Sequence, residues 1–118
     1  MEWQPFSFET LRGSDGSTRI IRLTGPLVLQ NIFDLQNELA KEPDSVTIFD
    51  LTAVPYMDSA GMGVITNHYV SAMRHGGKVI VAGASARVLE LFKITRVDSI
   101  IPTAASVADA EKLAESPK

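Results

Sequence analysis

A short apolar run that leads directly into a serine and a helical pattern constrains the fold of this chain more than any other feature. The run, 46–49, is β-branched and aromatic, which is typical of a buried strand. Asp50 ends the run, and the loop that follows contains Pro55, which lacks a backbone donor. The helical pattern begins at Ser59, directly after Asp58. The sequence therefore predicts a serine hydroxyl in the first turn of a helix.

Two interpretations of Ser59 follow from this position. The first N–H groups of a helix lack internal partners, and the helix dipole is positive at that end. The hydroxyl of Ser59 could cap the helix, or the same position could stabilise a phosphate group on the serine. Asp58 could bond within its own turn and complement the dipole, or it could orient Ser59 or contact a partner. Both pairs of alternatives stay open.

The neighbouring residues carry similar alternatives. Gly61 and Gly63 lower helix propensity, so we expect close approach to a neighbouring backbone, or contact between the glycine backbone and a partner, to compensate. Met57 and Met62 could pack in the core or form an adaptable contact surface beside Ser59.

Hydrophobic periodicity and turn residues predict the remaining elements. The predicted strands are 6–11, 18–24, 46–50, 78–82 and 99–101, the first two forming an antiparallel hairpin around the turn residues 13–17. The predicted helices run from about 29 to 41, from Ser59 to Gly76, from Ser85 to Ile94 and from Thr103 to Ala114. In the first helix the predicted apolar face consists of Leu29, Ile32, Phe33, Leu35 and Leu39.

Alternating strands and helices after an initial hairpin indicate an α/β fold with parallel crossover strands. We expect one domain over residues 1–118, with its core at about 6–114, built from a mixed sheet of about five strands and about four helices. Helices should cover one face of the sheet, and the other face should be thinly covered.

Composition argues against several function classes. The formal net charge of −3 argues against a nucleic-acid surface. The chain has no cysteine, and its two histidines have no carboxylate at metal-ligand spacing, so neither a metal nor a cofactor is expected. No apolar run approaches the roughly 18 residues of a membrane span, and the N-terminus lacks the pattern of a signal peptide. We therefore expect a cytoplasmic protein.

These residues resemble the STAS domain, in particular the anti-sigma factor antagonist type. The resemblance covers about 6–113, and its most specific part is the turn Asp58-Ser59-Ala60-Gly61-Met62-Gly63 after a strand that begins Val-x-Ile-x-Asp-Leu. Other matching segments are 23–25 at the end of the hairpin, 77–81 and 88–98.

The resemblance implies a regulatory binding protein that is not an enzyme. In the family, the serine matching Ser59 is phosphorylated by a partner that is both an anti-sigma factor and an ATP-binding serine kinase. The unphosphorylated protein binds that partner and frees the sigma factor, and a serine phosphatase restores binding. The implied contact residues are Met57, Asp58, Ser59, Ala60, Gly61, Met62 and Gly63, in a protein that is a monomer or weak dimer.

Two departures from the family pattern bear on the partner and on one helix end. Family members often carry an acidic residue soon after the glycine that matches Gly25, where this chain has Pro26-Leu27-Val28. A frequent Thr-Gly-Leu is here Thr95-Arg96-Val97, so a glycine is missing near the end of the third helix.

Two other functions compete with the antagonist. The chain could be a STAS subunit that docks in another signalling assembly or in a lipid-transport complex without phosphorylation. It could also be an enzyme with Ser59 as nucleophile, but Ser59 lacks the Gly-x-Ser-x-Gly pattern. His68 follows Ser59 by roughly two and a half helical turns, too far to act as its base.

Overall fold

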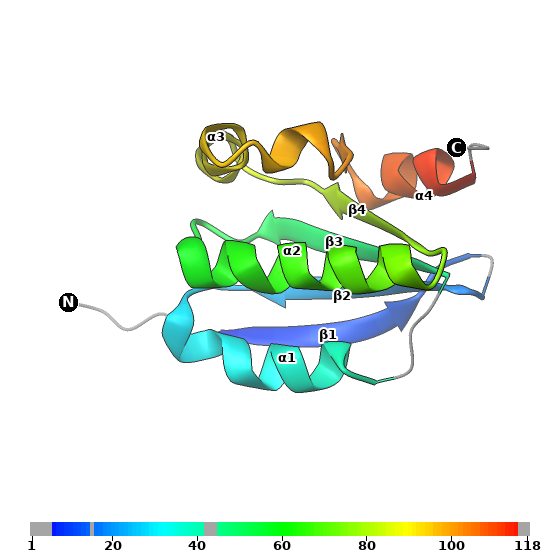
Figure 1. Cartoon of the computed structure of the whole chain (residues 1–118), viewed down its shortest axis with the longest axis horizontal. Helices are drawn as coiled ribbons and strands as arrows, with labels where there is room; N and C mark the ends of the chain where they lie inside the picture. The colour runs from blue at the N-terminus through cyan, green and yellow to red at the C-terminus, as the bar shows by residue number, and fades with distance from the viewer. Residues whose placement is uncertain (1–5, 15, 42–44, 116–118) are drawn as a thin grey trace.

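The computed structural model describes residues 6–14, 16–41 and 45–115 (Figure 1). The strands in these ranges are β1 (Ser7–Arg12), β2 (Thr18–Thr24), β3 (Val46–Ala53), β4 (Lys78–Ala82) and β5 (Thr103–Ala104). The α-helices are α1 (Ile32–Leu39), α2 (Ser59–Arg74), α3 (Ala86–Ile94) and α4 (Val107–Glu115). Two short 3₁₀ helices, η1 (Leu29–Asn31) and η2 (Val97–Ser99), precede α1 and follow α3.

The five strands form one mixed sheet in the order β1-β2-β3-β4-β5. β1 and β2 pair antiparallel, and every later pairing is parallel, as the hairpin followed by crossovers predicted. β3 is central, with Ile48 opposite Ile20 on one side and Ile80 on the other. The predicted fold class is confirmed.

The two faces of the sheet are covered unequally. One face packs against α1, α2 and α3, and its core includes Phe49 and Ile65, both fully buried. The other face has a smaller core of Ile20, Ile48, Ile80 and Ala82 under Ala110 of α4. Figure 1 shows α1 and α2 side by side in front of the sheet, consistent with the contacts between them. The expectation of one thinly covered face is correct.

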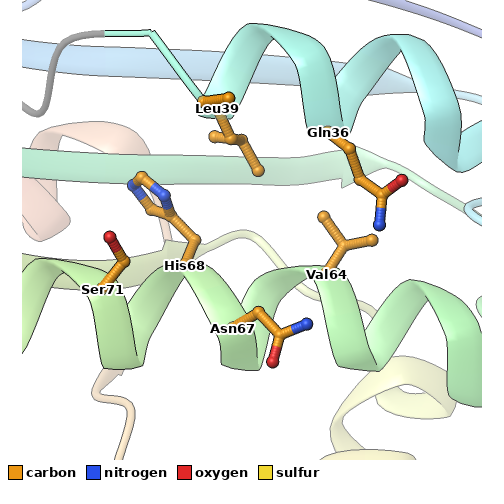
Figure 2. Close-up of a pocket in the computed structure, with 7 residues that line it drawn as sticks. Gln36, Leu39, Val64, Asn67, His68 and Ser71 are labelled. Carbon is orange, nitrogen blue, oxygen red and sulfur yellow. The ribbon is translucent and has the colours of Figure 1, made fainter.

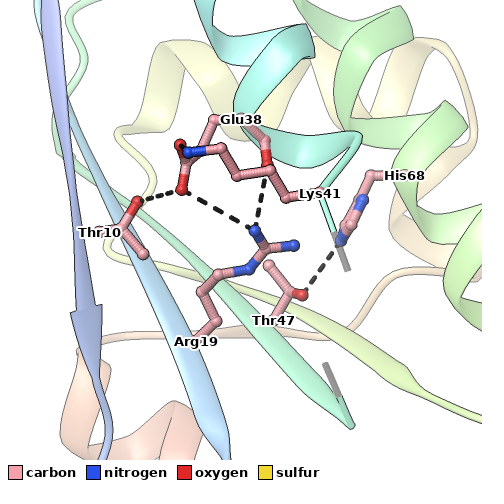
Figure 3. Close-up of polar contacts among 6 residues, drawn as sticks. All are labelled: Thr10, Arg19, Glu38, Lys41, Thr47 and His68. Carbon is pink, nitrogen blue, oxygen red and sulfur yellow. Dashed lines mark hydrogen bonds and ion pairs between the residues drawn. The ribbon is translucent and has the colours of Figure 1, made fainter. Parts of the chain in front are cut away.

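Polar contacts fix α1 and α2 against the sheet (Figure 3). Arg19 of β2 is buried and donates to the Glu38 carbonyl oxygen of α1 at 3.2 Å. The Glu38 carboxylate accepts from Thr10 of β1 at 2.9 Å and lies 3.0 Å from the Lys41 ammonium. His68 of α2 is buried, and its Nε2 forms a 3.0 Å hydrogen bond with the Thr47 hydroxyl of β3. These contacts hold both helices in register with the strands.

The predicted strand at 99–101 is wrong. The 3₁₀ helix η2 occupies 97–99, and both Ile100 and Ile101 donate their backbone N–H to the Val97 carbonyl oxygen. Ile101 is nevertheless buried, so its apolar character reports burial and not strand pairing. Pairing with β4 begins at Pro102, whose carbonyl oxygen accepts from the Val81 N–H at 3.0 Å and which needs no N–H for that bond.

Some predicted boundaries and faces also differ. The last helix begins at Val107, not at Thr103, because Ser106 caps it by accepting from the Asp109 N–H at 3.1 Å. The first helix ends at Leu39, shortly before its predicted end near 41, and Pro43, which follows that predicted end, lies outside the described residues. Of its predicted apolar face, Ile32 and Leu35 are buried, but Leu29 and Phe33 are 56% and 62% exposed.

Candidate functional site

The loop between β3 and α2 runs beside the segment that follows β2. Leu27 donates its N–H to the Tyr56 carbonyl oxygen at 3.1 Å, and its own carbonyl oxygen accepts from the Asp58 N–H at 3.3 Å. This pairing forms an isolated parallel bridge between Leu27 and Met57. Because both segments leave the carboxyl ends of neighbouring parallel strands, they reach the same edge of the sheet. The start of α2 is thereby fixed to the loop before α1.

Asp58, and not Ser59, is the cap of α2. Its backbone is extended, and its Oδ1 accepts from the Gly61 N–H at 3.0 Å, as a helix cap does. Its Oδ2 accepts from the Leu29 N–H at 3.1 Å, which ties the helix start to the neighbouring loop. The interpretation of Asp58 as a residue that bonds its own turn is confirmed, and the interpretation of Ser59 as the cap is wrong.

Ser59 is the first residue of α2 and is exposed. Within the part of the chain that the structure describes, its hydroxyl forms no hydrogen bond. The positive end of the helix dipole lies at this residue. The structure therefore places an accessible hydroxyl where added negative charge is favoured and where no cap would be lost.

The two glycines of the first turns have different environments. A Cβ on Gly61 would collide with the Leu27 carbonyl oxygen and would lie 2.9 Å from Leu27 Cγ. The predicted close approach is confirmed for Gly61. A Cβ on Gly63 would meet no atom of the described residues within 4 Å, so their packing does not explain that glycine. Gly63 lies one helical turn after Ser59, on the same face of α2.

The remaining predicted contact residues divide by burial. Gly61 and Met62 are buried, and Met62 packs in the core with only 5% of its surface exposed. They support the surface and form little of it. Met57, Asp58 and Ala60 are partly buried, and together with Ser59 and Gly63 they leave surface accessible around the start of α2.

Sequence reasoning missed a groove beside Asp58. The groove has a volume of about 350 Å³ and lies between α3 and the loops that precede α1 and α2. Its lining residues are Val28, Tyr56, Met57, Asp58, Arg87, Glu90, Leu91 and Ile94. The Arg87 guanidinium carbon lies 5.0 Å from the centre of the Tyr56 ring, a cation–π arrangement. No sequence pattern indicates this pair, because the two residues are far apart in the chain.

A second hollow, of about 230 Å³, lies between α1 and α2 (Figure 2). Its lining residues are Gln36, Leu39, Ala40, Val64, Asn67, His68 and Ser71. His68 is held by Thr47 and lies edge-on to Phe49, with ring centres 5.7 Å apart. None of the predicted contact residues around Ser59 lines this hollow. His68 therefore belongs to the core contacts of α2.

Two absences hold for the described residues. Across 6–14, 16–41 and 45–115, no group of three or more histidine or carboxylate side chains could hold a metal ion. In the same ranges no helix is both long and apolar enough to cross a membrane.

Comparison with known proteins extends the sequence resemblance. A curated relative, "Anti-sigma-B factor antagonist" of Listeria monocytogenes, is 40% identical over 52 residues, which cover 44% of this chain and 46% of the relative. The match thus spans about half the length of that relative. A crystal structure of an anti-sigma factor antagonist from Mycobacterium paratuberculosis superposes with a TM-score of 0.85 at 14% identity, over 95% of this chain and 96% of that one.

A third similarity concerns a phosphorylated protein. The structure of the Bacillus cell fate determinant SpoIIAA in its phosphorylated form superposes with a TM-score of 0.72 at 16% identity, over 91% of this chain and 99% of that chain. At such identities the superpositions show a shared fold. The STAS domain family model matches residues 11–110. The five-stranded mixed sheet, the Asp58-capped helix α2 and this match over most of the sequence together show that the chain belongs to the STAS domain family.

Proposed function

We propose that this protein is an anti-sigma factor antagonist that phosphorylation of Ser59 switches off. The unphosphorylated form binds an anti-sigma factor that is also an ATP-binding serine kinase, and a serine phosphatase reverses the modification. In this proposal the protein is a regulatory binding protein of the cytoplasm, with no catalytic residue of its own, and a monomer or weak dimer. The names of its relatives support the antagonist role.

The observation that carries the proposal is the division of labour between Asp58 and Ser59. Asp58 caps α2 with one carboxylate oxygen and binds Leu29 with the other, so the helix start does not depend on Ser59. The Ser59 hydroxyl is exposed at the positive end of the helix. A phosphate adds roughly −1.5 to −2 charges at neutral pH, and this position tolerates them without loss of a cap.

The effect on binding follows from charge and bulk. A partner that packs over Ser59 would meet a dianion where it had met a small neutral hydroxyl. Asp58 adds a like charge next to the phosphate, which favours an outward orientation toward the partner. A loss of about 3 kcal/mol would weaken binding more than a hundredfold.

Phosphorylation itself is the first test. Each anti-sigma factor of the serine-kinase type encoded by the native host is purified and incubated with this protein and ATP, and the products are measured by intact mass and peptide mapping. We expect one phosphate on Ser59 and none on Ser59→Ala. The matched control is Ser71→Ala, a variant of another serine in the same helix. This variant should still accept one phosphate on Ser59. Modification by none of these kinases, or modification elsewhere, would contradict the proposal.

A further inference from the structure

The groove that Asp58 and Arg87 line, here called the α3 groove, continues the surface around Ser59. Asp58 forms part of its wall, and Ser59 is the next residue in the chain. Along its other wall α3 contributes Arg87, Glu90, Leu91 and Ile94. A protein that packs over Ser59 can therefore also contact the groove at Asp58.

An apolar patch in the α3 groove is open to solvent. Ile94 is 70% exposed, the largest exposure among the large apolar side chains in the described ranges. Leu91, Val28 and Met57 are partly buried beside it in the same lining. Removal of this apolar surface from water would favour binding of an apolar side chain.

Arg87 is the one cation among the described residues that line the α3 groove, and its guanidinium is packed on the Tyr56 ring. Arg87 lies over the Tyr56 ring, and no ion pair joins it to a carboxylate in the described part of the chain. Asp58 also lines the groove, but its two oxygens are held by the backbone N–H groups of Leu29 and Gly61 and form no ion pair with Arg87 in the described residues. Glu90 also lines the groove, and within the described ranges no hydrogen bond or ion pair fixes its carboxylate there. The fixed cation is thus the charge to which a partner's carboxylate is complementary.

We propose that the anti-sigma partner inserts an apolar side chain against Ile94 and Leu91 and pairs an adjacent carboxylate with Arg87. This inference rests on the proposed function and names the chemistry of the partner's contact. It also gives a cause for the switch, since a phosphate on Ser59 would repel a carboxylate bound nearby and would compete with it for Arg87.

The test is calorimetric titration of a kinase-type anti-sigma factor that binds the wild-type protein. The variants are Arg87→Ala, Arg87→Glu and Ile94→Ala. The matched controls are Lys112→Glu on α4, which covers the other face of the sheet, and Ile100→Ala, an exposed apolar residue outside the groove. We expect Arg87→Ala and Ile94→Ala to weaken binding roughly fivefold or more, and Arg87→Glu at least about twentyfold. The controls should stay within about twofold.

Two further readouts keep the result specific. Arg87→Lys should recover part of the affinity because it keeps the charge, and added salt should weaken the wild type more than Arg87→Ala. Thermal unfolding shows whether each variant is folded. If the wild-type protein binds and both Arg87→Glu and Ile94→Ala bind with the same affinity, this inference is overturned and the proposed function stands. Tighter binding by Arg87→Glu would indicate a basic partner surface and would also overturn this inference. No binding by the wild type would contradict the proposed function itself.

Discussion

The Asp58 carboxylate joins the start of α2 to Leu29, whose backbone N–H it accepts at 3.1 Å while its other oxygen caps the helix. One side chain thereby fixes two loops that border Ser59. This relationship makes Asp58 a structural residue, and it predicts a cost in stability that does not depend on any partner.

Replacement of Asp58 by alanine should lower the free energy of unfolding by about 1–3 kcal/mol, since the change removes a helix cap and leaves the Leu29 N–H without its acceptor. Asp58→Asn keeps one carbonyl oxygen and should lose less. Urea denaturation of both variants measures the difference. If Asp58→Ala unfolded at the same urea concentration as the wild type, these two hydrogen bonds would contribute nothing to stability.

Gly61→Ala should be destabilising by about 1–3 kcal/mol, because the added methyl group collides with the Leu27 carbonyl oxygen. Gly63→Ala is the matched control in the same helix, and it should gain up to about 1 kcal/mol from helix propensity. Thermal unfolding compares the two. If both alanines changed stability equally, the close approach at Leu27 would not be the reason for Gly61.

Gly63 allows a separate test of the surface around Ser59. Because an added Cβ meets no atom of the described residues within 4 Å, Gly63→Leu should keep the protein folded. In the proposed complex the same side chain would lie one turn from Ser59 and obstruct the anti-sigma partner. The expected result is a normal melting temperature with affinity reduced at least about tenfold. Unchanged affinity would exclude Gly63 from the contact surface.

Arg96, which takes the place of the glycine in the family pattern that the sequence resembles, has a left-handed backbone with φ at 64°. Arg96→Gly should therefore raise the free energy of unfolding by about 1 kcal/mol. Lys93→Gly, within α3, should instead lower it by about 1 kcal/mol. Chemical denaturation of the two variants gives the sign of each change, and destabilisation by Arg96→Gly would contradict the strain argument.

Acid should weaken the contact between α1 and β1. Hydrogen bonds from Lys41 and Thr10 lower the pKa of Glu38 below its ordinary value of 4.5. A carboxyl group with a lowered pKa in the folded state stabilises the protein above about pH 4.5, and that contribution is lost as the pH falls through the folded-state pKa. Glu38→Gln should thus reduce stability at pH 7, and the difference from wild type should shrink at pH 3. An equal difference at both pH values would show that ionisation of Glu38 is not involved.

Local patterns were sufficient to predict most of the architecture. The β-branched runs at 46–49 and 79–81 are buried strands, and their alternation with helices gave the parallel order. The strand predicted at 99–101 is wrong because Ile101 is buried without strand pairing. A short apolar run has the same sequence pattern whether it is a buried strand or a buried segment of another kind. Leu29 and Phe33 belong to the predicted apolar face of the first helix but are exposed, because the sequence does not distinguish an apolar residue on the surface from one in the core.

The site was predictable in position and less so in detail. The strand followed by Asp58-Ser59 indicated the start of a helix, and α2 begins at Ser59. Which of the two residues caps the helix depends on side-chain geometry that spacing does not contain. The pairs Tyr56–Arg87 and Leu27–Gly61 come from segments distant in the chain, and only the fold brings them together.

The central claim is that charge on Ser59 controls partner binding and leaves the fold unchanged. Calorimetric titration of Ser59→Ala and Ser59→Asp against the kinase-type anti-sigma partner tests it most directly, with circular dichroism to confirm that both variants are folded. The account predicts that Ser59→Ala binds like the unphosphorylated protein and resists the kinase, and that Ser59→Asp binds at least about a hundredfold more weakly. Equal affinities for the two folded variants would contradict the switch.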